Sequence, residues 1–200
     1  MIRTIALVVL TLCLAVTSVS FGAGEPYVSG RVGYTVPHDY KDLEVKRFLS
    51  VAAAHGHEWN RGYGRLRLEG EVSYRQNELD RTAAGDARGH IRVAGFLINA
   101  VVAANTGPVV SPYGLVGGGG AWTFIDDAKV EGVKVANDNR LQGAYQLGGG
   151  LEFHLSPVVS LDLGYRYFST SEDRFKNKFD GRFPYRYRTH DVGLGVLVRF

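Results

Sequence analysis

The last eleven residues, 190–200, alternate between apolar side chains and side chains that are mostly small or charged. The apolar positions are Phe200, Val198, Val196, Leu194 and Val192, and the positions between them hold Arg199, Leu197, Gly195, Gly193 and Asp191. A period of two residues predicts a β-strand with one apolar face and one wetter face. On a soluble domain, an apolar edge strand ending in a bare phenylalanine would promote aggregation. The pattern therefore favours a membrane strand over the edge strand of a soluble all-β domain.

Eight strand-like segments are predicted along the chain. They are 26–36, 45–57, 62–76, 88–103, 110–124, 141–155, 158–168 and 186–200. The alternation is clearest in 62–76, where Leu66, Leu68 and Val72 are interspersed with charged residues. It breaks in 88–103, because Asn99 falls on the same phase as the apolar Ile91. We expect a β-bulge there, since one extra residue shifts the register of a strand.

The connections between these segments alternate in length. Short turns are predicted at 58–61, 104–109 and 156–157, and long polar loops at 37–44, 77–87, 125–140 and 169–185. An even number of strands, with short turns at one end and long loops at the other, is typical of a transmembrane β-barrel. The fold class we predict is all-β, an eight-stranded antiparallel up-and-down transmembrane barrel with its long loops outside the cell.

Composition agrees with an exported membrane barrel. Residues 1–22 resemble a secretory signal peptide, with Arg3 before a short apolar run, which leaves 23–200 as the barrel domain. The single cysteine, Cys13, lies in this peptide and follows Leu12, so neither a disulfide nor a lipid anchor is expected. A mean hydropathy of −0.08 argues against a helical membrane protein. The net charge of +3 is too small to indicate a nucleic-acid partner.

Several glycine- and tyrosine-rich motifs carry a resemblance to a known family. They are PYVSG at 26–30, PYGLVGGG at 112–119, YQLGGGLE at 145–152 and LDLGYRYF at 161–168. With these motifs in this order and spacing, the chain resembles the Gram-negative eight-stranded barrels that include the barrel of OmpA, OmpX and the Omp25/Omp31-type surface antigens. The resemblance implies a cell outer membrane location. It also implies that Gly195, Val198 and Phe200 form the C-terminal β-signal that the barrel assembly machinery recognises.

The charged residues of the strands fall on the phase opposite the apolar one, which faces the lumen of a barrel. The predicted lumen charge network comprises Arg65, Arg67, Glu69, Glu71, Arg75, Arg92, Glu152, Asp162, Arg166, Asp191 and Arg199. Both signs are present, and an eight-stranded barrel is wide enough only for side chains. We therefore expect a plug of paired charges, and the alternative is a small porin-like pore.

Aromatic residues are expected to form two girdles on the outward face, at the two membrane interfaces. Near the extracellular strand ends lie Tyr74, Trp122, Phe124, Tyr165 and Tyr167, and near the periplasmic ends lie Tyr113, Phe153 and Phe200.

Two short motifs suggest chemistry. His154 and Ser156, with Glu152 nearby, resemble the His-x-Ser pair of PagL-type lipid A deacylases, but the following residues depart from that pattern. This makes a lipid A-modifying enzyme an alternative, and we predict no catalytic residue. His55 and His57 share a strand face beside a predicted turn, but no third ligand is identifiable, so a solvated turn is expected rather than a metal site. No cofactor is predicted.

The last long loop combines arginines and lysines with aromatic residues. Extrapolating the phase of the final strand, Arg186 and Arg188 should point outward just above the membrane. Guanidinium groups bind phosphate through paired hydrogen bonds, so lipopolysaccharide or an external polyanion could bind there. We predict a structural or surface-interaction protein, with roles in envelope integrity, adhesion or as a surface antigen. Its expected partners are membrane lipid and an external ligand or host surface, and a monomer is expected.

Overall fold

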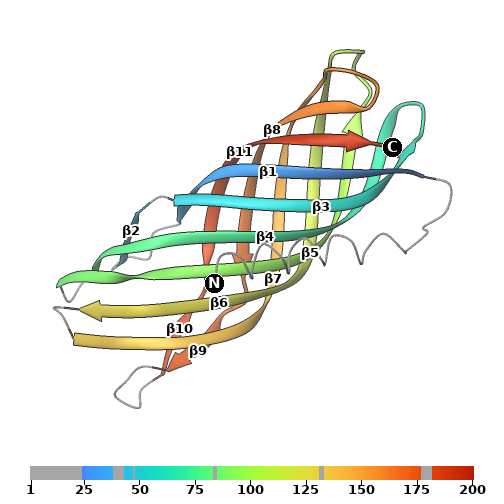
Figure 1. Cartoon of the computed structure of the whole chain (residues 1–200). Coiled ribbons are helices and arrows are strands. Elements are labelled where there is room, and N and C mark those ends of the chain that lie inside the picture. The colour runs from blue at the N-terminus through green and yellow to red at the C-terminus, as the bar shows by residue number, and fades with distance from the viewer. Residues whose placement is uncertain (1–23, 38–42, 47, 83–84, 131–132, 177–181) are drawn as a thin grey trace.

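The computed structural model describes residues 24–37, 43–46, 48–82, 85–130, 133–176 and 182–200, and the predicted signal peptide lies outside them. All regular elements in these ranges are strands (Figure 1). They are β1 (Glu25–Pro37), β2 (Leu43–Lys46), β3 (Phe48–Asn60), β4 (Gly64–Thr82), β5 (Gly85–Ala104), β6 (Val110–Val130), β7 (Val133–His154), β8 (Val159–Thr170), β9 (Asp173–Lys176), β10 (Arg182–Tyr185) and β11 (Arg188–Arg199). No helix among the described residues is long and apolar enough to cross a bilayer.

Eight strands close into a barrel of antiparallel neighbours. The order runs from β1 through β3, β4, β5, β6, β7 and β8 to β11, and β11 pairs back onto β1 from Tyr27↔Arg199 to Pro37↔Thr189. Closure pairs the edges that an open sheet would leave exposed. The predicted eight-stranded antiparallel barrel is confirmed.

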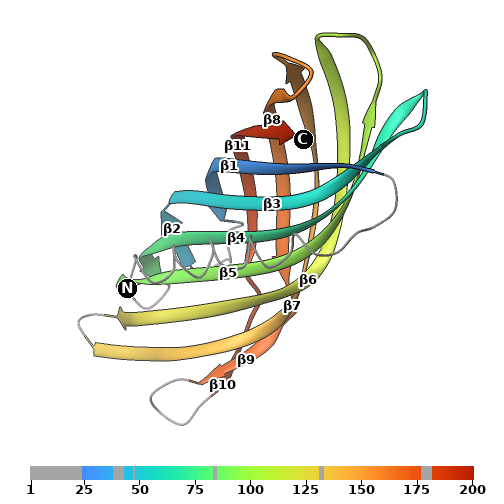
Figure 2. The same cartoon turned by 45° about the vertical axis from the view of Figure 1, so that its right-hand side comes forward.

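The strands extend beyond the predicted boundaries on the side of the long connections. β4 runs to Thr82 and β5 resumes at Gly85, while β6 and β7 continue as 21- and 22-residue strands to Val130 and from Val133. Figures 1 and 2 show β4 to β7 extending past the end of β1. A tilted strand crosses the hydrocarbon in about 9–11 residues. The expectation of loops at 77–87 and 125–140 was therefore wrong, because a hydrogen-bonded ladder can continue into water with polar side chains.

The other two long connections also contain strands. β2 spans the boundary between the predicted loop 37–44 and the predicted strand 45–57 and pairs with β4, and β9 pairs with β10 inside 169–185. The short connections are tight turns, as the hydrogen bond from Arg61 N to Gly64 O (2.8 Å) and the positive φ of Gly62 indicate.

β5 departs most from the sequence-based expectation. Its register with β4 is continuous from Ala104 to Gly89, so no bulge occurs at Asn99. Asn99 is buried in the lumen on the same side as Ile91, Val93 and Leu97. The apolar phase of this strand therefore faces inward at its extracellular end, where it packs against other apolar side chains.

The assignment of Arg92 to the lumen network is wrong for the same reason. Arg92 pairs with Gln76 of β4 and Phe124 of β6, and all three occupy outward positions. On β4 the charged side chains are the ones that point into the lumen, whereas on this part of β5 the apolar side chains point into the lumen.

The outer surface of the barrel is apolar and the interior is largely polar. Leu66, Leu194 and Ile98 are exposed, whereas Arg67, Glu69 and Arg166 are buried inside the barrel. Lipid offers no hydrogen bonds, so this orientation is the one a membrane-spanning barrel requires.

Towards the extracellular end, the lumen holds a small apolar cluster that we call the outer apolar plug. Its buried members are Ile91, Val93, Leu97, Ala121, Ala144, Phe168 and Tyr187. The lumen is therefore filled by apolar side chains at this level and by charged side chains nearer the periplasmic turns.

Candidate functional site: the charged interior of the barrel

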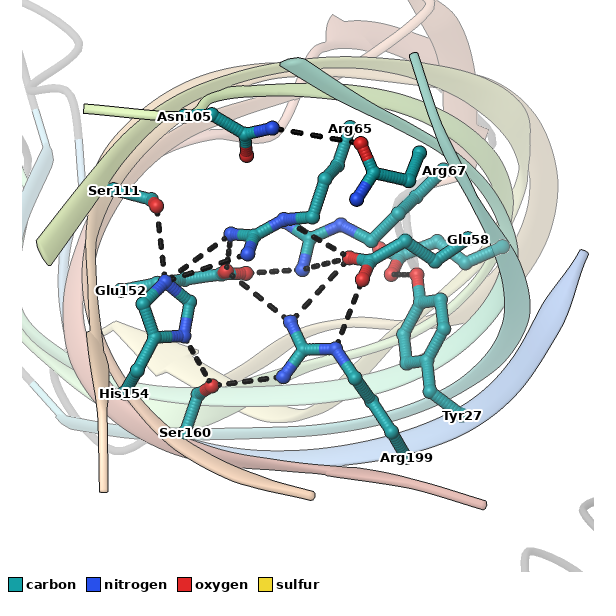
Figure 3. A network of polar contacts seen from close by, with 12 residues as sticks. Tyr27, Glu58, Arg65, Arg67, Asn105, Ser111, Glu152, His154, Ser160 and Arg199 are labelled. Carbon is teal, nitrogen blue, oxygen red and sulfur yellow. Dashed lines mark hydrogen bonds and ion pairs between the residues drawn. The ribbon is translucent and has the colours of Figure 1, made fainter. Parts of the chain in front are cut away.

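The periplasmic end of the lumen is crossed by five ion-pairing side chains, the inner charge cluster: Glu58, Arg65, Arg67, Glu152 and Arg199 (Figure 3). Arg199 Nε lies 2.9 Å from Glu58 Oε1, and Arg65 Nη2 lies 2.8 Å from Glu152 Oε2. Arg67 also contacts Glu152 directly. These residues come from β3, β4, β7 and β11, so their ion pairs connect opposite walls of the barrel.

His154 lies beside the inner charge cluster, between two serines. Its Nδ1 is 2.9 Å from Ser160 Oγ, and its Nε2 is 2.9 Å from Ser111 Oγ and 3.4 Å from both terminal nitrogens of Arg65. A guanidinium can only donate, so Nε2 must accept and Nδ1 carries the proton. The imidazole is thus held neutral as a link in a structural network.

The predicted His154–Ser156 pair does not form. Ser156 Oγ instead accepts a hydrogen bond from Val159 N (3.0 Å) in the β7–β8 turn. Nδ1 of His154 donates to a serine rather than to a carboxylate, so no carboxylate orients the ring as in a catalytic triad.

Two tyrosines enclose Arg67 in the next layer of the lumen. The Arg67 guanidinium carbon lies 5.6 Å from the Tyr27 ring centroid and 5.7 Å from the Tyr113 centroid, within cation–π range. Tyr27 Oη donates to Glu69 Oε2 at 2.5 Å. Tyr113 therefore points inward, and its predicted place in the periplasmic girdle is wrong.

Glycines on β7 and β8 make room for the inward-pointing ring of Tyr113. A Cβ atom added at Gly150 would lie 2.9 Å from Tyr113 Cε1, and one at Gly164 would lie 2.3 Å from Tyr113 Oη. The glycine-rich motifs therefore provide space for a ring that crosses the lumen.

A second polar layer, the upper charge cluster, lies between the tyrosines and the outer apolar plug. Arg166 contacts Glu71, and Asn99 Nδ2 donates to Glu69 (2.9 Å) and Glu71 (3.1 Å). Gln146 Nε2 donates to Asn99 Oδ1 at 2.8 Å. The Asn99 amide thus links Glu69 to the Glu71 oxygen that Arg166 also contacts.

Arg75 links the upper charge cluster to the outer apolar plug. Its Nε lies 2.8 Å from Asp191 Oδ2, and its guanidinium carbon lies 4.0 Å from the Phe168 ring centroid. The stacked, ion-paired arginine joins the charged and apolar parts of the interior.

Charge is balanced across these clusters. With Arg31, which donates to Gly164 O (2.8 Å), and the inward Asp162, they contain six arginines and six carboxylates. The arginines are Arg31, Arg65, Arg67, Arg75, Arg166 and Arg199, and the carboxylates are Glu58, Glu69, Glu71, Glu152, Asp162 and Asp191. Equal numbers allow the interior to exclude water without a net buried charge.

Of the predicted lumen residues, the structure places all but Arg92 on inward positions. Sequence reasoning missed Tyr27, Arg31, Glu58, Asn99 and Gln146. The phase of their strands would have indicated Tyr27, Arg31 and Gln146. Glu58 was assigned to a turn, although β3 continues to Asn60.

The remaining predicted positions lie on the outer surface or at the barrel seam. Arg186 and Arg188 are half-buried and occupy the outward phase that leads into β11. Val198 and Phe200 also face outward, and Phe200 N donates to Pro26 O (3.1 Å) at the β1–β11 seam. A Cβ atom at Gly195 would lie 3.0 Å from Gly30 O and 3.4 Å from the Asp162 side chain.

His55 and His57 lie on the outward face of β3, not beside a solvated turn. Their ring centroids are 5.9 Å apart, and the His57 ring stacks on Trp59 at 6.3 Å. Among the described residues, no three His, Cys, Asp or Glu side chains are grouped so that they could hold a metal ion.

Solved structures with the same fold include several outer-membrane barrels. Neisserial surface protein A is 17% identical with a TM-score of 0.55, over 88% of this chain and 97% of that one. OprG from Pseudomonas aeruginosa is 12% identical with a TM-score of 0.52, over 89% and 97%. The outer membrane enzyme PagL is 14% identical with a TM-score of 0.43, over 87% and 99%. The likenesses to Neisserial surface protein A and OprG indicate the fold and not the function.

No curated protein matches the chain. A family model described as the outer membrane protein beta-barrel domain matches residues 4–200. This match covers all eight strands of the closed barrel, with its apolar exterior and its buried charge clusters. The chain therefore belongs to the outer membrane protein β-barrel domain family and is a protein of the cell outer membrane.

Proposed function

We propose that this protein is a non-catalytic, non-conducting component of the outer membrane that acts through its extracellular surface. The proposed roles are envelope integrity, adhesion and display as a surface antigen. The observation that carries the proposal is the filled lumen, in which ion pairs, two tyrosines and the outer apolar plug succeed one another along the axis.

The chemistry of the lumen supports a plug over a pore. An ion entering from the periplasm would have to displace Arg199 and Arg65 from Glu58 and Glu152, and would then meet the apolar plug. Separating a buried ion pair leaves uncompensated charges, which is strongly unfavourable. The neutral, serine-bonded His154 likewise supports a structural role over the deacylase alternative.

The refolded protein is expected to give no steady single-channel steps in planar bilayers. The barrel should still insert into the bilayer, because its outer surface is apolar. The heat-dependent gel mobility of a folded barrel would verify folding in the same preparation. A refolded larger porin serves as the positive control. Reproducible conductance steps from the folded protein would contradict the proposal and favour the small-pore alternative.

The proposed partner at the extracellular rim is lipopolysaccharide, held at Arg186 and Arg188. Both arginines occupy outward positions just beyond the aromatic cluster of the β8–β11 rim. In that cluster the hydroxyl of Tyr165 lies 2.6 Å from His190 Nδ1, and the Tyr167 and His190 rings are 5.3 Å apart. Aromatic side chains mark the membrane interface, where the lipid phosphates lie.

Charge reversal of both arginines, Arg186→Glu with Arg188→Glu, is expected to reduce the lipopolysaccharide that co-purifies with the barrel several-fold. The reason is that two phosphate-binding cations become repulsive. The readout is lipid phosphate per mole of folded protein. Arg61→Glu, at an exposed periplasmic turn, is the control and should leave the amount unchanged. Equal amounts in the rim variant and the wild type would refute this site.

A further inference from the structure

A groove of about 360 Å³ lies on the outer surface of the barrel, across β3, β4, β5 and β6. Its lining is mostly apolar or small, and includes Ala53, Gly70, Val72, Phe96, Ile98 and Gly118. Ile98 pairs with a glycine on each side, Gly70 of β4 and Gly118 of β6. No side chain therefore fills the space beside Ile98 on either neighbouring strand.

Large and small side chains are mixed on the outward face on both sides of the groove. On the extracellular side, Phe96 lies beside Gly120, and Ala94 lies between Tyr74 and Trp122. On the periplasmic side, Ala100 lies between Leu68 and Val116. Ala94 and Gly120 leave space among the aromatic side chains on the side from which an acyl chain of the outer leaflet would approach.

Polar side chains lie further along these strands, towards their extracellular ends. Arg92 occupies the outward position next to Gln76 in the register, and Tyr74 Oη donates to Gln76 Oε1 at 3.2 Å. Arg92 and Ile98 are six residues apart on β5, which is about 20 Å along a strand. At the usual tilt this is about 15 Å along the membrane normal, or one leaflet of a hydrocarbon core of about 30 Å.

We propose that this groove binds one acyl chain of a lipopolysaccharide molecule whose phosphate is held at Arg92. The apolar groove matches the acyl chain, the guanidinium matches the phosphate, and their separation matches the depth of the leaflet. The proposal extends the lipopolysaccharide contact proposed for Arg186 and Arg188 to a separate face of the barrel. The two sites lie on different strands, so variants of one leave the other intact and either can fail alone.

The test fills the groove. In Gly70→Leu the new side chain occupies the groove without a backbone clash, because a Cβ atom at Gly70 meets nothing within 4 Å. The full barrel is analysed by native mass spectrometry with added rough lipopolysaccharide. We expect about tenfold weaker retention of the lipid than in the wild type, which corresponds to about 1.4 kcal/mol.

Gly114→Leu is the matched control, since Gly114 also faces outward with nothing within 4 Å but does not line the groove. Heat-dependent gel mobility verifies that each variant folds, and Gly118→Leu replaces Gly70→Leu if the latter does not. Arg92→Gln should weaken retention of phosphorylated lipid A but not of its dephosphorylated form.

Three outcomes would overturn the proposal. The first is equal retention of lipopolysaccharide by Gly70→Leu and the wild type. The second is retention of phosphatidylglycerol as strong as that of lipopolysaccharide, with the same loss in the variant, which would indicate a general lipid groove. The third is a protein dimer that disappears in Gly70→Leu, which would assign the groove to a second copy of the chain.

Discussion

Glu152→Ala is expected to destabilise the folded barrel by about 3–5 kcal/mol, the usual cost of removing one partner from a buried ion pair. Glu152 is almost completely buried, and it contacts Arg65, Arg67 and Arg199. Its removal leaves Glu58 as the one carboxylate of the inner charge cluster facing three guanidinium groups. The measurement is urea unfolding in phospholipid vesicles, followed by tryptophan fluorescence and gel mobility.

Two further variants serve as comparisons. Glu152→Gln keeps the volume but removes the charge, so it should also be strongly destabilising. Glu25→Ala removes an exposed carboxylate at the start of β1 and should change the free energy of unfolding by less than about 0.5 kcal/mol. An unfolding midpoint of Glu152→Ala equal to that of the wild type would mean that the cluster does not stabilise the barrel.

Gly150→Ala is expected to prevent formation of the folded barrel. A Cβ atom at this position would lie 2.3 Å from Leu163 O and 2.7 Å from Gly164 Cα, both in the backbone of β8, and 2.9 Å from the Tyr113 ring. No change of side-chain rotamer relieves a clash with backbone atoms. Refolding into detergent micelles should therefore yield little of the heat-modifiable form.

Gly114→Ala provides the comparison for this loss, because it adds the same methyl group to β6 where no atom lies within 4 Å. It should refold like the wild type. A normal yield of folded Gly150→Ala would show that β7 and β8 can separate locally, and the packing of Tyr113 against these glycines would then need revision.

The closed barrel could be predicted because alternation of side chains is a local property of the sequence. Residues such as Leu66 and Arg67 are fixed on opposite faces of β4 by the pleat alone. Once eight such segments are present, with a pattern of short and long connections, closure is the arrangement that leaves no unpaired edge in lipid.

The composition of the lumen was harder to predict, because it depends on which strand faces which across the barrel. Arg92 was expected inside since the charged side chains of β4 point inside, but the extracellular half of β5 faces the outer apolar plug, to which Phe168 of β8 and Tyr187, just before β11, contribute. Tyr113 was expected outside because tyrosine is common in girdles, but glycines at 150 and 164 accommodate its ring inside.

The boundaries of the strands were missed for a different reason. Polar residues in 77–87 and 125–140 were interpreted as loops, since the membrane was assumed to end the strands. Backbone pairing continues outside the membrane, for example at Ala128↔Ala136 and Val130↔Val133. The alternation of apolar side chains stops at the edge of the membrane, although the strands continue. The predicted strand boundaries depended on that alternation.

The overshoot of β6 and β7 changes what an antibody or receptor would encounter at the cell surface. A segment already fixed by interstrand hydrogen bonds is ordered before a partner binds. It therefore loses little further conformational entropy on binding. The resulting epitope is conformational, because it depends on the pairing of β6 with β7. Linear peptides copied from 125–140 contain both strands but lack this fixed pairing, so they should be poor mimics of the native surface.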